Sequence, residues 1–225
     1  MAKKNIIPVF GDIHGRWKKI NRIVNHHVNS NGLALSTGDL CNYQFNPNNN
    51  QTLFFCYGNH ESFQYIEELI KSNKGNLQTR AAGEVFEFDG LKITTFPGVY
   101  SEHFFNNGEK IKYFSKKDLE RALSIEDPID ILITHEAPFD VGVKKNNEDL
   151  GKEIINNIID HLKPKIVFFG HHDIYLDNEY KGVRIIGLDQ PHRSYVLLDT
   201  SDFSIRKIKA TLENEKEYKY NWEIN

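Results

Sequence analysis

Asp12 and His14 stand two residues apart, directly after the apolar run at 6–10, with a glycine on either side. In an extended segment the side chains of residues i and i+2 point to the same side. One carboxylate and one imidazole are therefore expected to face the same point, and both groups are ordinary ligands of divalent metals. Gly11 and Gly15 allow the backbone to turn sharply beside them. This stretch predicts part of a metal site, whose remaining ligands must come from elsewhere in the chain.

Four further apolar runs each end in a polar cluster of the same kind. In chain order the clusters are Asp39 after 33–35, Asn59 and His60 after 52–57, His135 after 129–133, and His171 and Asp173 after 166–169. In open α/β sheets, ligands bind outside the carboxyl ends of the strands. The supply of donors exceeds what one ion needs, so the sequence predicts two hard or borderline divalent cations that share a carboxylate, roughly 3.5–4 Å apart.

The segments between these clusters predict the elements that position them. Apolar residues recur at helical spacing in 16–28, 63–70, 115–123 and 150–162. Two β-rich runs around Asp89-Gly90 predict a hairpin over 85–96. The other expected segments are an irregular region at 97–113, strands at 183–186, 195–198 and 203–208, and an edge strand or frayed tail at 213–225. The pattern predicts one α/β domain over 1–225 with a mixed sheet.

The composition narrows the class of protein. Lys and Arg number 28 and Asp and Glu number 31, which gives a formal net charge of −3. Charges of both signs are interspersed, so nucleic-acid binding is unsupported, although a net figure leaves a locally basic groove open. No stretch is long and apolar enough for a membrane span or a signal-peptide core, which predicts a soluble cytoplasmic protein. Cys41 and Cys56 lack disulfide-framework spacing and are expected to be reduced thiols beside buried strands. The oligomeric state is left open.

Five motifs occur in order, each directly after a predicted strand. They are Gly11-Asp12-Ile13-His14-Gly15, Gly38-Asp39, Gly58-Asn59-His60-Glu61, Thr134-His135 and Gly170-His171. Together they resemble the calcineurin-like metallophosphoesterase family, whose pattern reads DxH, GDxxD/N, GNHD/E, H and GHxH. Each motif alone is weak, but all five in order form a strong signal. The resemblance implies a four-layer αββα sandwich of two mixed β-sheets flanked by helices.

The resemblance also implies a role for each matching residue. Asp12 and His14 would hold the first metal, Asp39 would bridge both metals, and Asn59, His135 and His171 would hold the second. His60 would be the catalytic residue beside the metals, where it donates a proton or a hydrogen bond to the substrate. Asn42 would support the ligands from behind.

Asp173 departs from the family pattern, because it stands where the last histidine of GHxH is expected. We predict that Asp173 still ligates the first metal through a carboxylate oxygen. The alternative is that it falls short and the first metal is weakly held. An added carboxylate favours Mn²⁺ or Mg²⁺ over Zn²⁺, so Mn²⁺ is the expected cofactor, with Mg²⁺, Fe, Zn²⁺ or Co²⁺ as alternatives. His172 would replace it only if the turn were rotated, since adjacent side chains of an extended segment point apart.

The predicted function is hydrolysis of a phosphate mono- or diester by a metal-bridging hydroxide, with His60 protonating the departing oxygen. Gly38-Asp39 continues as Leu40-Cys41-Asn42, whereas serine/threonine protein phosphatases have the segment GDxVDRG here. This difference favours a phosphorylated small molecule or a nucleotide as substrate. The alternatives are a non-catalytic protein-binding module on the same fold and a nuclease.

Two residues are candidate substrate contacts. Arg193 could hold a phosphate as a bidentate donor, or it has only a surface role. His103, beside three aromatic residues, belongs to a loop that serves as a lid or a stacking surface, or it packs within that loop. Glu61 is expected to be an acid at a helix N-terminus, and Glu136 to face solvent or to lie behind the ligands.

Overall fold

The computed structural model describes residues 6–72, 74–108 and 110–210, so the predicted tail at 213–225 lies outside the described residues. The helices are α1 (Trp17–His27), α2 (Phe63–Ser72), α3 (Glu102–Asn107), α4 (Lys116–Leu123) and α5 (Glu153–Leu162). The strands are β1 (Ile6–Phe10), β2 (Leu33–Ser36), β3 (Thr52–Phe55), β4 (Leu77–Gln78), β5 (Val85–Phe88), β6 (Leu91–Phe96), β7 (Ile131–Thr134), β8 (Lys144–Lys145), β9 (Glu148–Asp149), β10 (Ile166–Phe169), β11 (Leu176–Tyr180), β12 (Val183–Gly187), β13 (Ser194–Asp199) and β14 (Ser204–Lys209).

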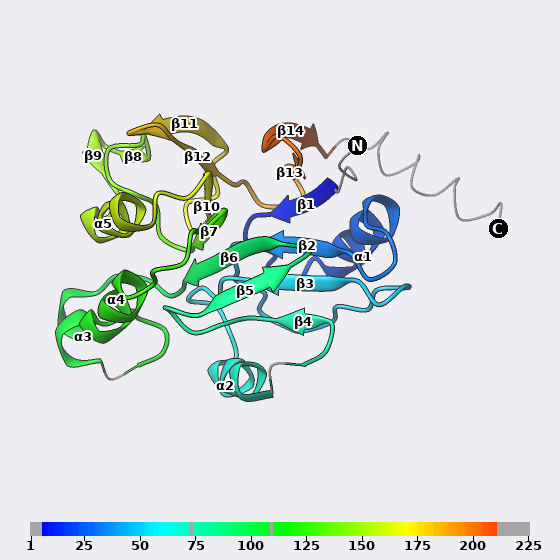
Figure 1. Cartoon of the computed structure of the whole chain (residues 1–225), viewed down its shortest axis with the longest axis horizontal. Coiled ribbons are helices and arrows are strands. Elements are labelled where there is room, and N and C mark those ends of the chain that lie inside the picture. Colours follow the sequence, from blue (N-terminus) through cyan, green and yellow to red (C-terminus); the bar gives the residue numbers. More distant parts are fainter. Residues whose placement is uncertain (1–5, 73, 109, 211–225) are drawn as a thin grey trace.

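The described strands form two six-stranded sheets and a small hairpin of β8 and β9. The strand order is β14-β13-β1-β2-β3-β4 in the first sheet and β11-β12-β10-β7-β6-β5 in the second. Figure 1 shows the two sheets stacked, with helices outside them. Each sheet is mixed, because its central strands are parallel while β13, β14, β11 and β5 run antiparallel to their neighbours. The predicted sandwich of two mixed β-sheets flanked by helices is confirmed.

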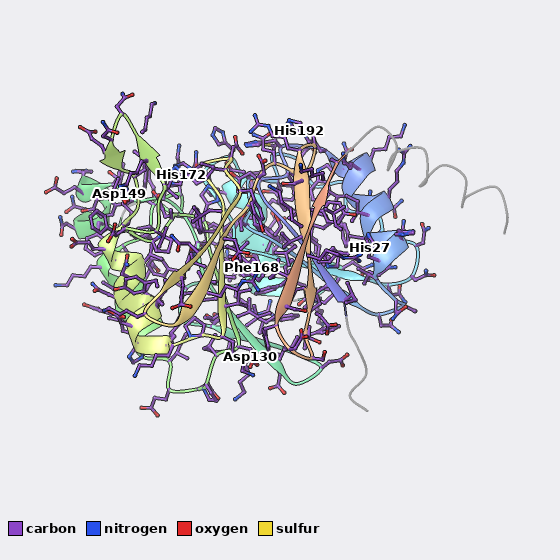
Figure 2. All side chains as sticks on the ribbon, turned by 90° about the horizontal axis from the view of Figure 1, so that it is seen from above. His27, Asp130, Asp149, Phe168, His172 and His192 are labelled. Atoms are coloured by element: carbon purple, nitrogen blue, oxygen red, sulfur yellow. The ribbon has the colours of Figure 1, made fainter. Side chains whose placement is uncertain are left out.

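Three hydrophobic clusters hold these layers together. The central cluster takes alternate residues from both sheets, such as Leu35, Phe54, Ile133 and Phe168, and Figure 2 shows Phe168 in the middle of the molecule. The residues that point the opposite way pack against α1 and α2 on one side and against α4 and α5 on the other. Burying a side chain of this size stabilises the fold by about 1.5–3 kcal/mol. Successive side chains of each strand point to opposite faces, and both faces are covered by apolar residues. This explains why the strands appear in the sequence as unbroken apolar runs.

The parallel strands place their carboxyl ends at one edge of the sandwich. β1, β2 and β3 are parallel neighbours in the first sheet, and β6, β7, β10 and β12 are parallel neighbours in the second. In Figure 2, Asp130, which precedes β7, and His172, which follows β10, lie at opposite edges. Chain segments far apart in the sequence therefore meet where these strands end.

The structure differs from the sequence-based expectations in a few segments. The region 97–113, expected to be irregular, contains α3, and β4, β8, β9 and β11 were not expected. Three of these strands have only two residues, and β11 (LDNEY) is largely polar, so neither type carries a strand pattern. None of the described helices is long and apolar enough to cross a lipid bilayer.

Candidate metal centre

The turn that carries Asp12 and His14 is bound directly to the turn that carries Asp39. The N–H groups of Ile13, His14 and Gly15 donate to the carbonyls of Gly38, Asp39 and Leu40, at 3.1, 2.7 and 3.1 Å. His14 has a φ of 45°, so the extended geometry expected for this segment is wrong. The expected convergence nevertheless occurs, because the pairing of the two turns brings the His14 ring to Asp39.

Two groups of ligand-type side chains lie at this edge of the sandwich. Asp12, Asp39 and His135 form one group, and Asp12, His14 and Asp173 form the other, each with its ligand atoms within 4.8 Å of one another. Carboxylate oxygens and imidazole nitrogens that converge in this way are suited to divalent cations. Asp12 belongs to both groups, so the two groups are adjacent.

Asp39 also faces residues of both groups. Its Oδ2 lies 3.9 Å from Nε2 of His14, and its Oδ1 lies 3.7 Å from Nε2 of His135. The main-chain N–H of His60 donates to Oδ1 at 2.8 Å and fixes the orientation of the carboxylate. One carboxylate thus presents one oxygen to each side of the centre.

Asp12 is held from two other segments. Thr37 Oγ1 donates to its Oδ1 at 3.1 Å, and the main-chain N–H of His171 donates to its Oδ2 at 2.9 Å. Burial raises the pKa of Asp12 to about 7; the His135 ring opposes this shift, and the carboxylates of Asp39 and Asp173 add to it. Crowded, buried negative charge of this kind is relieved when a cation binds among the carboxylates.

His135 is fully buried, and its ring orientation is set by the main chain. Its Nδ1 lies 2.8 Å from the carbonyl oxygen of Thr37, which leaves Nε2 for a ligand on the other side. That Nε2 lies 3.1 Å from Oδ1 of Asn59. Burial lowers the pKa of His135, but the carboxylates of Asp12 and Asp39 outweigh burial, so that the pKa is raised. His135, Asn59 and Asp39 therefore direct donor atoms at one place.

Asp173 leaves one carboxylate oxygen open. Gln190 Nε2 donates to Oδ2 at 2.6 Å, whereas Oδ1 is buried without a hydrogen-bond partner. A buried oxygen without a partner is unfavourable, and a carboxylate oxygen of Asp173 belongs to the group with Asp12 and His14. Asp173 is therefore well placed to bind a cation together with Asp12 and His14.

His171 and His172 have different surroundings. The His171 ring lies 5.0 Å from the His135 ring, centroid to centroid, and burial lowers the pKa of His171 to about 3. It is therefore neutral, as a metal ligand must be, although its side chain belongs to neither of the two groups above. His172 lies 3.8 Å from the carboxylate of Glu136. Glu136 is 3% exposed and accepts the N–H of Tyr100, so the alternative that it faces solvent is wrong.

The remaining predicted residues lie at the rim or beyond it. The exposed His60 ring packs edge-on against His14 at 5.7 Å. Asn42 is exposed, and its side chain lies against Gly15, where it would support the turn. Arg193 donates to the carbonyl of Asp173 at 3.3 Å and to Asp189 at 3.1 Å, which places it near the metal centre.

His103 lies on α3, where it contacts Phe104 and Asn107 of its own helix. These contacts do not join it to the metal centre. Of the two candidate substrate contacts, Arg193 is therefore the one whose position is tied to a predicted ligand.

Glu61 was expected only as an acid at a helix N-terminus, but it connects the two loops that carry Asp39 and Asn59. Its carboxylate accepts from Leu40 N at 3.1 Å, from Tyr43 Oη at 2.9 Å and from Gly58 N at 3.5 Å. Burial raises the pKa of Glu61 to about 7. The GNHE motif gave its position but not the partners Leu40 and Tyr43, which come from a different loop.

Both cysteines are free thiols, Cys56 buried and Cys41 exposed. Cys41 Sγ lies 3.4 Å from Nδ1 of His14. The thiol therefore touches a predicted ligand on the ring nitrogen that faces away from Asp39.

Comparison with known proteins agrees with this architecture. The sequence profile described as calcineurin-like phosphoesterase matches residues 7–175. No curated protein matches the chain. A crystal structure of a protein from Thermus thermophilus matches with a TM-score of 0.70 and 10% identity, covering 93% of this chain and 100% of that one.

Two structures with descriptive names also match. An archaeal phosphodiesterase has a TM-score of 0.50 and 16% identity, over 91% of this chain and 99% of that one. The phosphopantetheinyl hydrolase PptH from Mycobacterium tuberculosis has a TM-score of 0.57 and 12% identity, over 95% and 99%. At these identities the likeness shows the fold alone.

Proposed function

Because the chain belongs to the calcineurin-like phosphoesterase family, we propose that it hydrolyses a phosphate mono- or diester with two divalent cations. The residues proposed for the first cation are Asp12, His14, Asp39 and Asp173, and those for the second are Asp39, Asn59, His135 and His171. One observation carries this proposal: the two oxygens of Asp39 face His14 and His135 on opposite sides, at 3.9 and 3.7 Å. A carboxylate in this position suits a pair of cations better than one.

Bound cations of this kind neutralise the phosphate oxygens and lower the pKa of a water. The protein side chains hold them and complete the site. Asp12 and Asp39 supply buried negative charge, and Thr37 fixes the ring of His135 through its carbonyl. The exposed His60 ring, beside His14, would donate a proton or a hydrogen bond to the departing oxygen. General acid assistance contributes on the order of 10²–10⁴-fold to the rate.

The proposed cation is Mn²⁺, with Mg²⁺ next. Three carboxylates, those of Asp12, Asp39 and Asp173, belong to the two groups of ligand atoms. Oxygen-rich sites suit Mg²⁺ and Mn²⁺ better than Zn²⁺. The proposed substrate is a phosphorylated small molecule or a nucleotide. The names of the archaeal phosphodiesterase and of PptH are reasons to test diesters as well as monoesters.

The test is a rate measurement on the purified full-length protein with 4-nitrophenyl phosphate and bis(4-nitrophenyl) phosphate. Each substrate is assayed with added Mn²⁺, Mg²⁺, Zn²⁺ or Co²⁺, and bound metal is counted by mass spectrometry. We expect about two bound ions per chain and metal-dependent turnover. Asp39→Asn should lose both the bound ions and the turnover. Glu120→Gln, which removes an exposed carboxylate on α4, is the matched control and should leave both unchanged.

The other outcomes separate the alternatives. A protein that binds metal but is inert toward both esters would favour a non-catalytic binding module. Cleavage of single-stranded or duplex DNA in preference to both small esters would favour a nuclease. A protein that binds no metal would reject the proposal.

A further inference from the structure

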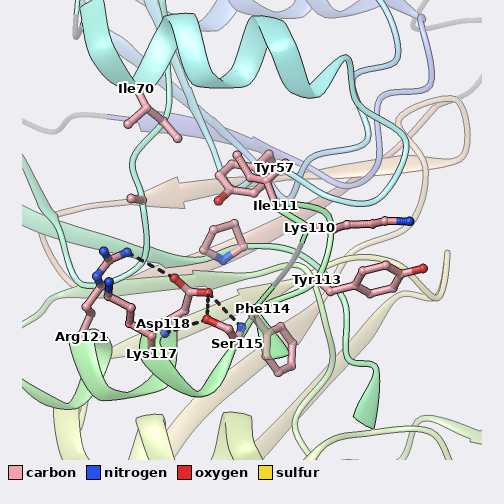
Figure 3. Close-up of a pocket in the computed structure, with 13 residues that line it drawn as sticks. Tyr57, Ile70, Lys110, Ile111, Tyr113, Phe114, Ser115, Lys117, Asp118 and Arg121 are labelled. Carbon is pink, nitrogen blue, oxygen red and sulfur yellow. Dashed lines mark hydrogen bonds and ion pairs between the residues drawn. The ribbon is translucent and has the colours of Figure 1, made fainter. Parts of the chain in front are cut away.

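A cavity of about 310 Å³ lies between α2, α4 and the carboxyl ends of β3 and β6 (Figure 3). Its apolar walls come from Ile70, Pro97, Ile111 and Phe114. None of the described residues that line it is a predicted metal ligand. Its volume falls at the lower end of the range for small-molecule sites, about 300–1,000 Å³. The cavity is therefore separate from the metal centre and large enough for a small organic molecule.

Tyr57 brings a hydroxyl to this cavity. The residue is 6% exposed, and Figure 3 shows its hydroxyl pointing into the open space above Asp118 and Arg121. Within the described part of the chain, this hydroxyl has no hydrogen-bond partner. The hydroxyl faces the open cavity and is free to donate to a molecule that binds there.

The charges on one side of the cavity are predominantly positive. The Asp118 carboxylate accepts from the N–H and the hydroxyl of Ser115, at 2.9 and 2.6 Å, and from Arg121 at 3.4 Å. Lys117 and Arg121 both line the cavity on this side. The cavity side therefore carries two cations and one carboxylate, and this carboxylate already accepts two hydrogen bonds from Ser115 and one from Arg121. Lys110 also lines the cavity, with its ammonium group over the Phe104 ring at 5.2 Å.

We propose that this cavity binds a small anionic molecule with a flat apolar body. The apolar body would pack between Ile70, Ile111 and Phe114. Its anionic group would lie against Lys117 and Arg121 and accept the hydrogen bond of Tyr57. A charged acceptor forms a stronger hydrogen bond than a neutral one. The apolar walls offer contact area to an apolar molecular body, which a fully hydrated ion would not use. The proposal does not depend on the metal centre or on its activity.

The test uses naphthalene-1-sulfonate as the probe and naphthalene-1-methanol as its neutral counterpart, with binding measured by calorimetry on the full-length protein. We expect the sulfonate to bind with 1:1 stoichiometry and the alcohol about tenfold more weakly. Tyr57→Phe, which removes only the hydroxyl, should weaken sulfonate binding by about threefold to tenfold. The double variant Lys117→Gln/Arg121→Gln should weaken it by at least about tenfold.

Two controls make the result decisive. Lys116→Gln removes a charge from the neighbouring exposed position of α4, outside the cavity lining, and should leave the affinity unchanged. Asp39→Asn alters the metal centre and should also leave it unchanged. Equal affinity for both probes, no binding of the sulfonate, or loss of binding in Asp39→Asn with retention in Tyr57→Phe would each overturn the proposal. The lysine and arginine variants change exposed side chains, so they test the site even if Tyr57→Phe folds poorly.

Discussion

Gly58 lies directly against the carboxylate of Asp39, so that a β-carbon added at Gly58 would stand 2.3 Å from Asp39 Oδ1. The same atom would stand 2.3 Å from Cε1 of His135. Contacts this short force both side chains to move. The close approach of the main chain at this point is what allows the two side chains to share one space.

Gly58→Ala is therefore expected to disrupt the metal centre. Overpacking in a buried site typically costs about 1–3 kcal/mol, and displacement of Asp39 and His135 should lower metal content and turnover together. Gly90→Ala is the control, because its added β-carbon meets open space. It should lose only about 1 kcal/mol of stability, because alanine is strained at the positive φ of this position, and it should keep its metal. Urea unfolding and metal analysis measure both effects; normal metal content in Gly58→Ala would contradict the expectation.

Asp173→Ala should lose the first cation and keep the second. Oδ1 of Asp173 is buried without a partner, and its carboxylate groups with Asp12 and His14, whereas Asn59 and His135 lie on the other side of Asp39. We expect about one ion per chain in place of two, measured by metal analysis after dialysis. Asp177→Ala, which removes an exposed, ion-paired carboxylate on β11, is the comparison. Unchanged stoichiometry for both ions would show that Asp173 is not a ligand.

His60→Ala should keep both cations and lose rate selectively. If the ring assists the departing oxygen, alkyl phosphates should slow by on the order of 10²–10⁴-fold, and nitrophenyl phosphates, whose leaving group needs little protonation, much less. Steady-state kcat/KM on the two kinds of ester gives the comparison, and His26→Ala, on the exposed side of α1, is the control. An equal loss on both esters would argue against the acid role.

His27→Gln should reduce the loss of stability in mild acid. His27 Nε2 lies 3.0 Å from the Tyr195 hydroxyl, and burial lowers the pKa of His27 to about 4 from an ordinary 6.5. Between these values the unfolded chain takes up a proton that the folded chain does not, so stability falls as the pH drops from about 6.5 to about 4. The variant should recover roughly 1–2 kcal/mol of that loss, since solvent screens part of the effect.

The measurement for His27 is urea unfolding across this pH range. Above pH 7 both states carry a neutral ring, so the pH-dependent part of the difference should vanish. His103→Gln, an exposed residue of α3, controls for the loss of a histidine. Parallel pH profiles for His27→Gln and the unmodified protein would contradict the assignment.

Glu61→Ala should loosen the two loops of the centre. Its carboxylate accepts from Leu40, Tyr43 and Gly58, and leaving such donors unsatisfied costs about 1–3 kcal/mol. Glu61→Gln keeps one oxygen acceptor and should recover most of the stability and kcat. The exposed Glu68→Ala on α2 is the control. If Glu61→Ala lost stability but kept full kcat, the role of Glu61 would be structural only.

The periodicity predicted an α/β domain with polar clusters after its strands, and the family resemblance supplied the two-sheet sandwich. Apolar runs such as 166–169 end where the strands end. Parallel pairing of β1 and β2 brings Asp12 and Asp39 together, and the stacking of the second sheet on the first adds His135. Within one sheet, the carboxyl ends of parallel strands meet by geometry, so the pairing of Asp12 with Asp39 needed no knowledge of contacts between the sheets.

Other parts of the centre depend on long-range contacts that the sequence does not encode locally. The bend at His14 arises from its pairing with the turn at Asp39, and Gln190 reaches Asp173 across 17 residues. Two partners of Glu61, Leu40 and Tyr43, come from another loop. A pattern read along the chain identifies polar positions after strands, but it does not show which side chains hold them.

Four of the proposed ligand positions have left-handed main-chain conformations: His14 at φ 45°, Asp39 at 48°, His171 at 67° and Asp173 at 52°. Outside glycine, such conformations favour asparagine, aspartate and histidine and disfavour β-branched or bulky residues. During evolution these positions can therefore exchange one donor type for another, as aspartate for histidine at position 173, without rebuilding the turn. A drift to valine or isoleucine would strain the backbone as well as remove the donor, so the turn geometry itself restricts the evolutionary routes by which this centre can change its metal.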